Sequence, residues 1–195
     1  MTPPDPVHRF LDAQRAFDAT VQSIAADEWH NTTPCVDWDV RALVNHLVYE
    51  QLWATPLMDG ATVEDVGDRF DGDLLGSDPI SAWKIAAAES AAAVSAPGAQ
   101  ERTINTSMGP SPATQYLSEM TCDLVVHRWD LGQAIDREER FTDDEVAQVE
   151  ALVAAISPMQ SQLEAAGIFG PPVEVPRNAD AQTRVLAALG RSAQP

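Results

Sequence analysis

The stretch from Ser111 to Ile135 constrains the fold of this 195-residue chain more than any other part of the sequence. Ser111 and Pro112 form a typical helix start, a capping residue followed by a first-turn proline, and nothing breaks the helix until about Ile135. The sequence therefore predicts one long helix over residues 112–135. Residues at steps of three and four mark the face that it should bury: Tyr116, Met120, Asp123, His127 and Ala134, with Leu117, Leu124 and Leu131 alongside.

Two ionisable residues, Asp123 and His127, occupy this predicted buried face. Because they are four residues apart, their side chains should lie one above the other on the helix. Burying an unpaired carboxylate costs on the order of several kcal/mol, so Asp123 needs a cation, and a divalent metal shared with His127 would supply one. A hydrogen-bonded Asp–His pair is the alternative, and it is the favoured interpretation of these two residues alone. A third ligand would favour the metal.

The candidate third ligand lies on an earlier helix, predicted over residues 38–58 with Asp37 as its N-cap. One face of that helix carries residues at steps of three and four: Leu43, His46, Glu50, Trp53 and Leu57. A lone buried histidine usually donates to a backbone carbonyl. With Asp123 and His127 facing inward from another helix, the metal becomes the better interpretation. The sequence therefore predicts a metal site formed by His46, Asp123 and His127.

Glu50 follows His46 by one helical turn and could be a fourth ligand, a partner that contacts the ligands, or a general base. We favour the contact partner, because a dinuclear carboxylate site would need more inward-facing glutamates than this chain offers. His8 and His30 are interpreted as solvated residues. The Asp71-Gly-Asp73 segment lacks the later ligands and closing Glu of an EF-hand, so we expect no calcium loop there.

The remaining pattern predicts an all-α protein with a DinB-like four-helix bundle and additional short C-terminal helices. The bundle helices are expected over residues 6–25, 38–58, 79–96 and 112–135. A capping box of Thr142 and Glu145 should begin a fifth helix, and residues 180–189 a last short one. No strand pattern long enough to build a sheet is present. We expect a single domain over residues 1–195, with the bundle over about 6–165 and a tail over 166–195.

The composition excludes several classes of function. Twelve basic residues against thirty acidic ones give a formal charge of −18, which should repel nucleic acid and anionic lipid surfaces. No apolar run approaches the roughly twenty residues that cross a bilayer. The two cysteines, Cys35 and Cys122, are too few for a disulfide framework, and the first residues lack the basic and apolar regions of a signal peptide. A cytoplasmic location is therefore expected.

Several segments resemble a known family. They are Trp29, Thr33-Pro-Cys-Val-Asp-Trp-Asp-Val-Arg-Ala-Leu-Val-Asn-His-Leu47 and Asp123-Leu-Val-Val-His-Arg-Trp-Asp-Leu131. The chain is similar to the DinB-like metal-binding superfamily, close to the metal-binding domain of mycothiol-dependent maleylpyruvate isomerase. Residues 67–76 and the ending from Phe169 to Arg191 resemble an uncharacterised actinobacterial branch of that superfamily.

The resemblance implies a four-helix bundle that holds one divalent metal by three side chains. The first histidine of the family falls on His46, the second on His127, and the carboxylate on Asp123. The isomerase has a Glu where this chain has Asp123, so the reach of the carboxylate is shorter by one methylene. The isomerase also has a further C-terminal domain that helps to complete its substrate site, whereas a short tail follows Gly167 here.

Three protein ligands leave a fourth position open on a tetrahedral ion, as in catalytic zinc sites. Zinc is the expected metal and nickel the other candidate, and either a thiol or a water could fill the open position. The resemblance implies a metal-dependent S-transferase or isomerase that uses a mycothiol-type thiol on a small electrophile. The expected partners are thus a small-molecule thiol and electrophile, and a homodimer is compatible with the sequence.

Two further points bear on this function. Cys35 and Cys122 are poorer candidates for the nucleophile, because Cys122 points about a hundred degrees away from Asp123 and Cys35 precedes its helix. The tryptophans Trp38, Trp53 and Trp129 could line a pocket, although packing is their default role. The alternative function is a non-catalytic metal-binding helical bundle with a structural or protein-interaction role, which a fourth protein ligand such as Glu50 would favour.

Overall fold

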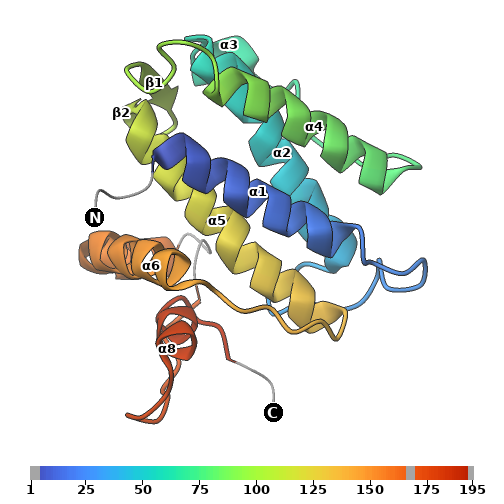
Figure 1. The fold of residues 1–195 in the computed structure, drawn as a ribbon, viewed down its shortest axis with the longest axis vertical. Helices are drawn as coiled ribbons and strands as arrows, with labels where there is room; N and C mark the ends of the chain where they lie inside the picture. The colour runs from blue at the N-terminus through green and yellow to red at the C-terminus, as the bar shows by residue number, and fades with distance from the viewer. Residues whose placement is uncertain (1–4, 166–169, 193–195) are drawn as a thin grey trace. The chain divides into compact units, whose positions relative to one another are not determined.

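The computed structural model describes residues 5–165 and 170–192 of the chain (Figure 1). Its contacts divide it into two compact units, Met1–Arg137 and Glu138–Pro195. The expectation of a single domain stays a prediction. The predicted bundle reached to about residue 165, whereas the long helices that pack on one another all lie within the first unit. Each unit is therefore considered by itself.

The first unit contains four long helices that pack as a bundle. They are α1 (Pro6–Val21), α2 (Val40–Met58), α4 (Pro79–Val94) and α5 (Ala113–Ala134). The closest neighbours are α2 with α4 and α1 with α5, and α2 also contacts α5 (Figure 1). The predicted mainly helical fold class is confirmed, and each predicted bundle helix matches an observed helix to within a few residues at either end. The contact between α2 and α5 brings the candidate ligands together.

Local sequence explains where these helices begin. Each of α1, α2 and α4 starts after an aspartate whose carboxylate accepts a backbone N–H of the first turn: Asp5 from Val7, Asp39 from Ala42 and Asp78 from Ser81. The prediction that Asp37 caps the second helix was wrong, because the residue two positions later takes that role. Both candidates are aspartates before the same apolar run, so composition alone does not distinguish them.

Large apolar side chains from all four helices fill the bundle. Among those without measurable exposure are Phe10, Phe17, Leu43, Leu47, Trp83, Leu117, Leu124 and Leu131. The rings of Phe17 and Trp83 meet edge to face with centroids 4.8 Å apart. A buried polar cluster also links three helices, because Gln51 Oε1 accepts hydrogen bonds from Gln14 Nε2 at 2.9 Å and Ser90 Oγ at 2.7 Å. The core is therefore specified by both packing and hydrogen bonds.

A short antiparallel hairpin precedes α5, formed by β1 (Thr103–Thr106) and β2 (Gly109–Pro112). The composition of residues 109–112 favours a turn, whereas in the structure they pair with residues 103–106. Ser111 therefore lies in a strand and does not cap α5, and the N-cap position is held by Pro112 without a side-chain hydrogen bond. Two strands of four residues tolerate these prolines because each strand keeps one free edge.

The connection between α2 and α4 contains a single helical turn, α3 (Val63–Val66), as the sequence suggested. The rest of it lies along α2. Asn45 Nδ2 donates to the Gly72 carbonyl at 3.1 Å, and Asn45 Oδ1 accepts from the Leu74 amide at 2.8 Å. Arg41 Nη2 donates to both carboxylate oxygens of Asp73 at 2.9 Å. These bonds hold the loop of residues 67–76, which we call the tethered loop, against α2.

The second unit contains α6 (Asp143–Ile156), a 3₁₀ turn at Ser157–Met159, α7 (Gln160–Ala165) and α8 (Ala181–Ala188), and α6 packs on α8. The predicted capping box is confirmed, since Thr142 Oγ1 accepts from the Glu145 amide and Glu145 Oε2 from the Thr142 amide. α6 ends at Ile156, and Ser157-Pro158 begins the 3₁₀ turn. The prolines and glycines of residues 167–176 favour an extended segment. Residues 167–169 lie outside the described part, and residues 170–176 contain no helix.

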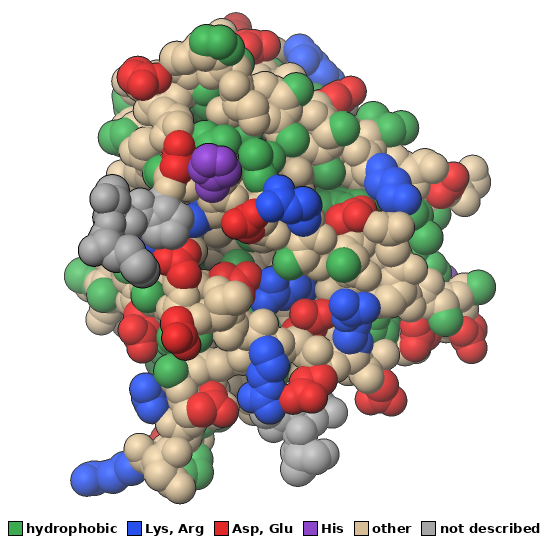
Figure 2. Space-filling model, viewed as in Figure 1, with side chains coloured by type: hydrophobic (Ala, Val, Ile, Leu, Met, Phe, Trp, Pro, Cys, Tyr) green, Lys and Arg blue, Asp and Glu red, His purple; other side chains and the backbone are tan. Residues whose placement is uncertain are grey.

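Within the described ranges, no helix is long and apolar enough to cross a membrane. On the face shown in Figure 2, acidic and basic side chains are interspersed over the surface. The excess of acidic residues is therefore not confined to one visible patch on that face.

Candidate metal centre

The three predicted ligands lie together between α2 and α5. His46 Nε2 is 3.2 Å from Asp123 Oδ2, and His127 Nε2 is 3.4 Å from Asp123 Oδ1. One ligand atom from each of the three side chains lies within 4.8 Å of the others. Asp123 and His127 share a face of α5 because they are one turn apart, and α2 supplies His46 from the neighbouring helix. Two imidazole nitrogens and a carboxylate thus converge on one point, which is a donor set that suits a divalent transition metal.

Aromatic packing fixes the orientation of the two imidazole rings. Their centroids are 5.2 Å apart, with an angle of 74° between the planes. The indole of Trp38 lies against both, with its centroid 4.7 Å from that of His46 and 5.7 Å from that of His127. Trp38 begins the segment that leads into α2. Trp38 therefore has the packing role expected of tryptophans by default. Its packing restrains two candidate ligands at once.

The candidate metal centre is open to solvent on one side. The side chain of His127 is 8% exposed, whereas those of His46 and Asp123 are 26% and 35% exposed. Asp123 lies on the inner face of α5 as predicted, but its side chain is only half-buried. Solvent reaches Asp123 and His46, and an exogenous molecule could do the same.

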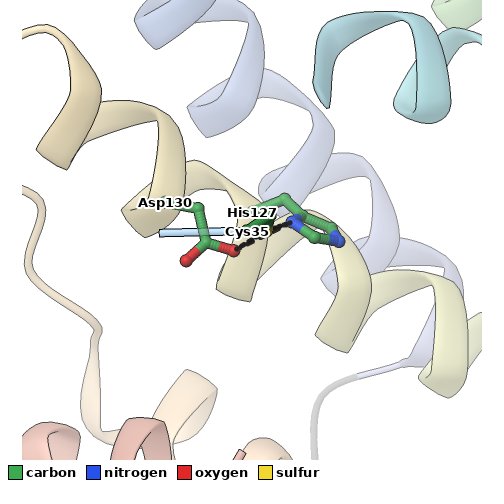
Figure 3. Close-up of side chains that lie close together, drawn as sticks. All are labelled: Cys35, His127 and Asp130. Carbon is green, nitrogen blue, oxygen red and sulfur yellow. Dashed lines mark hydrogen bonds and ion pairs between the residues drawn. The ribbon is translucent and has the colours of Figure 1, made fainter. Parts of the chain in front are cut away.

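The other nitrogen of His127 contacts a residue that the sequence analysis did not single out. His127 Nδ1 is 2.9 Å from Asp130 Oδ2, and Asp130 is completely buried (Figure 3). An ionised Asp130 can only accept, so Nδ1 carries a proton, which leaves Nε2 as the nitrogen that can offer its lone pair to a metal. This contact sets the tautomer that metal binding requires. The signal in the sequence was the three-residue step from His127 to Asp130 on one helical face.

Cys35 also lies at this inner side of His127. Its Sγ is 3.3 Å from Asp130 Oδ2 and 3.8 Å from His127 Nδ1 (Figure 3). Cys35, His127 and Asp130 form a second group of metal-ligand type. The thiol nevertheless faces Nδ1 and not Nε2, so it is not aimed at the point where the first three ligands converge. No pattern in the sequence linked it to His127, because the two residues are 92 positions apart.

The electrostatics of the centre follow from this crowding. Burial would raise the pKa of Asp123, but His127 and His46 outweigh it and hold that pKa well below its usual value. Burial would lower the pKa of His127, but Asp123 and Asp130 beside it raise the pKa well above its usual value. Without a metal, the protein therefore favours a protonated His127 between two carboxylates. A divalent cation would replace that proton as the positive charge.

Glu50 lies near the ligands on α2. Burial, and then the negative charge of Asp123, raise its pKa to about 7, while His46 and His127 oppose the shift. Among the described side chains, Glu50 does not belong to the group whose ligand atoms lie within 4.8 Å of one another. The charges of the candidate ligands thus affect the ionisation of Glu50. Its role as a partner that contacts the ligands stays a prediction. His8 and His30 are exposed, and His30 pairs with Asp39 at 3.0 Å.

A pocket of about 300 Å³ opens beside the metal centre. We call it the aromatic pocket, and it is lined by Trp38, Ala42, Asn45, His46, Tyr49, Phe70, Asp71 and Gly72. One wall is α2 and the other is the tethered loop, which places Phe70 and Asp71. Asp73 of the same loop pairs with Arg41. His46 belongs to both the pocket and the metal centre, so a molecule in the pocket would lie next to a candidate ligand.

A bundle that presents two histidines and a carboxylate from neighbouring helices defines a DinB-like helical protein. The comparison with known families agrees: the model described as the mycothiol maleylpyruvate isomerase N-terminal domain matches residues 10–132. The chain belongs to this family. The matched segment contains His46, Asp123 and His127, as well as Cys35 and Asp130.

Two curated relatives are similar over nearly their whole length. They are uncharacterised proteins from two strains of Mycobacterium tuberculosis, each 30% identical over 193 residues, which is 96% of this chain and 98% of the relative. The mycobacterial origin of these relatives agrees with the resemblance to an actinobacterial branch. No solved structure matches the chain significantly.

Proposed function

We propose that the protein is a cytoplasmic, metal-dependent S-transferase or isomerase that uses a low-molecular-weight thiol of the mycothiol type to act on a small electrophile. The single observation that carries this proposal is the convergence of His46 Nε2, His127 Nε2 and the Asp123 carboxylate at a point that solvent can reach. The mycothiol-related family supports the identity of the thiol.

The residues present fit a divalent metal. Both histidines offer Nε2, Asp123 offers both oxygens, and Asp130 fixes the tautomer of His127. Two nitrogens and one oxygen favour zinc, with nickel as the second choice. When bound, such an ion lowers the pKa of a thiol in its open position toward neutrality, which makes the thiol a nucleophile at physiological pH.

The protein's own side chains bind and orient the reactants in this proposal. The exposed edges of His46 and Asp123 leave the approach to the centre open, and the aromatic pocket beside His46 would hold the electrophile. Cys35 faces the opposite nitrogen of His127, so the nucleophile is expected to come from a small molecule. Trp38 packs on both imidazoles and would restrain them while the thiol attacks the electrophile.

The test is to substitute cobalt for the native metal and titrate the protein with mycothiol. A thiolate that enters the metal shell should add a sulfur-to-metal charge-transfer band, which water cannot produce. The His46→Ala and His127→Ala variants should lose the metal and the band, whereas His8→Ala, an exposed histidine, should keep both. Absence of the band at millimolar thiol in protein that carries cobalt would refute the proposal.

One observation favours a second function. Glu50 is close enough to Asp123 for the two carboxylates to influence each other's ionisation. If Glu50 closes the metal shell, the metal would be structural and the bundle a non-catalytic metal-binding protein. The Glu50→Gln variant distinguishes the two functions: a structural site should lose metal affinity, whereas an open site should keep it and still show the thiolate band.

A further inference from the structure

The lining of the aromatic pocket has an unusual balance of groups for a site that would receive a small electrophile. Three aromatic rings, those of Trp38, Tyr49 and Phe70, surround it, and Asp71 contributes a carboxylate. Trp53 supports two of these rings, with its centroid 5.7 Å from that of Tyr49 and 6.2 Å from that of Phe70. Among the described residues that line the pocket, none is Arg or Lys.

Two basic side chains that neighbour lining residues in the sequence, Arg41 and Arg69, have other partners. Arg41 binds the Asp73 carboxylate through two contacts of 2.9 Å and also donates to the Gly76 carbonyl at 2.8 Å. The guanidinium of Arg69 lies 5.7 Å from the centroid of Phe70, which is the distance of a cation–π contact. Arg41 is therefore paired with its own carboxylate, and Arg69 lies at a cation–π distance from Phe70 without lining the pocket.

Negative charge reaches the pocket from two directions. Asp71 lines it directly, and the Asp123 carboxylate is 3.2 Å from Nε2 of His46, another lining residue. Burial, and then the charges of Glu50 and Asp71, raise the pKa of the Tyr49 phenol. The described lining therefore offers an anion no Arg or Lys to pair with, whereas a cation would be attracted by both the Asp71 carboxylate and the ring faces.

We propose that the aromatic pocket selects a compact acceptor that carries an organic cation, such as an ammonium group, held by Asp71 and the faces of Trp38, Tyr49 and Phe70. This inference rests on the proposed function for the reaction and adds the class of its electrophile. The volume of about 300 Å³ is at the lower end of small-molecule pockets, so the acceptor is small. Polyanionic acceptors are disfavoured.

Binding is tested with three probes of similar size and different charge, namely benzyltrimethylammonium, benzyl alcohol and phenylacetate. Calorimetry and tryptophan fluorescence are measured on the full chain, both metal-free and loaded with zinc. The cation should bind about tenfold more tightly than phenylacetate, an advantage typical of a partly desolvated cation–π and carboxylate site. Equal or tighter binding of phenylacetate would overturn the proposal.

Charge variants locate the effect. Asp71→Asn should weaken the cation severalfold and leave benzyl alcohol unchanged, and Asp71→Lys should reverse the preference in favour of phenylacetate. Asp68→Asn removes the same charge from an exposed position of the tethered loop outside the pocket lining, and it should change neither affinity. If Asp71→Asn and Asp68→Asn behave alike, the pocket does not select by charge.

The readout separates this inference from the proposed function. Cation binding to the metal-free protein requires no thiol and no turnover, so it can succeed while the cobalt titration shows no thiolate band. In that case the pocket proposal stands and the transferase proposal fails. A thiolate band together with no preference for the cation gives the opposite result.

Discussion

His127 shows how one side chain serves two purposes through its two ring nitrogens. Nε2 faces Asp123 and His46, and Nδ1 is held by the buried Asp130. The four-residue step from Asp123 and the position of His46 made the outer contacts predictable from sequence. The contacts of Nδ1 were harder to predict from the sequence. Asp130 lies three residues after His127, so it could have been recognised as a partner on the buried α5. Cys35 comes from a loop, and no sequence spacing relates it to His127.

Removing the charge of Asp130 should weaken the metal centre without unfolding the bundle. In Asp130→Asn, the amide can donate to His127 Nδ1 and thus favour the tautomer whose Nε2 is protonated. We expect metal affinity to fall by about 10- to 100-fold, the usual effect of losing such a support. Competition with a chromophoric chelator measures the affinity. Glu119→Gln, an exposed charge change on the same helix, is the control and should match the parent protein.

Metal binding should depend on pH because His127 must lose a proton. Its pKa is raised in the metal-free protein, so below that pKa the proton competes with the metal, and affinity should fall as the pH falls. Calorimetric titration with zinc in buffers of different ionisation enthalpy should show release of about one proton per ion at neutral pH. Zinc binding without any proton release would contradict the protonated state inferred for His127.

At the scale of elements, helices were predictable and their junctions were not. Periodic apolar residues predicted α1, α2 and α4, although the cap of α2 is Asp39 and not the predicted Asp37. The hairpin before α5 was missed because Gly109-Pro-Ser-Pro112 has the composition of a turn, and strand pairing depends on a partner segment that local sequence does not specify. The same limit applies to the tethered loop, whose contacts with α2 join residues about thirty positions apart.

Asn45 should control the order of the tethered loop. Asn45→Ala removes the bonds to the Gly72 carbonyl and the Leu74 amide, which should cost about 1 kcal/mol of stability. Hydrogen exchange should become faster across residues 70–76 and stay unchanged in α1. Gln115→Ala, an exposed side chain on α5, should leave the loop protected. If exchange in the loop does not change in Asn45→Ala, these two bonds do not hold it.

At the scale of the whole molecule, the fold class and the family were predictable. The expectation of a single domain with its bundle over about 6–165 stays a prediction, and the apolar positions of α6 do not by themselves specify which helix it packs on. In the structure, α6 packs on α8 within the second unit. An amphipathic pattern specifies that a face will be buried, and the partner is decided by the rest of the fold.

Zinc should therefore stabilise the chain unevenly. All three candidate ligands lie in the first unit, and a ligand present at a hundredfold excess over its Kd stabilises the form that binds it by about 2.7 kcal/mol. Hydrogen exchange should slow in α2 and α5 on zinc addition, while α8 exchanges as before. Equal protection of both units would show that they unfold as one cooperative body.

The junction between the hairpin and α5 determines in which direction the candidate ligands on α5 point. The Ala113 amide donates to the Arg102 carbonyl at 3.0 Å, and the guanidinium of Arg102 donates to the Met58 carbonyl at the end of α2. Both helices that carry the ligands are thus hydrogen-bonded to Arg102. One residue inserted between that junction and Asp123 would rotate the downstream ligands by about 100° away from His46, whereas an insertion after Ala134 would leave their phase intact. Length variation in this protein should therefore be tolerated on one side of the metal centre and excluded on the other.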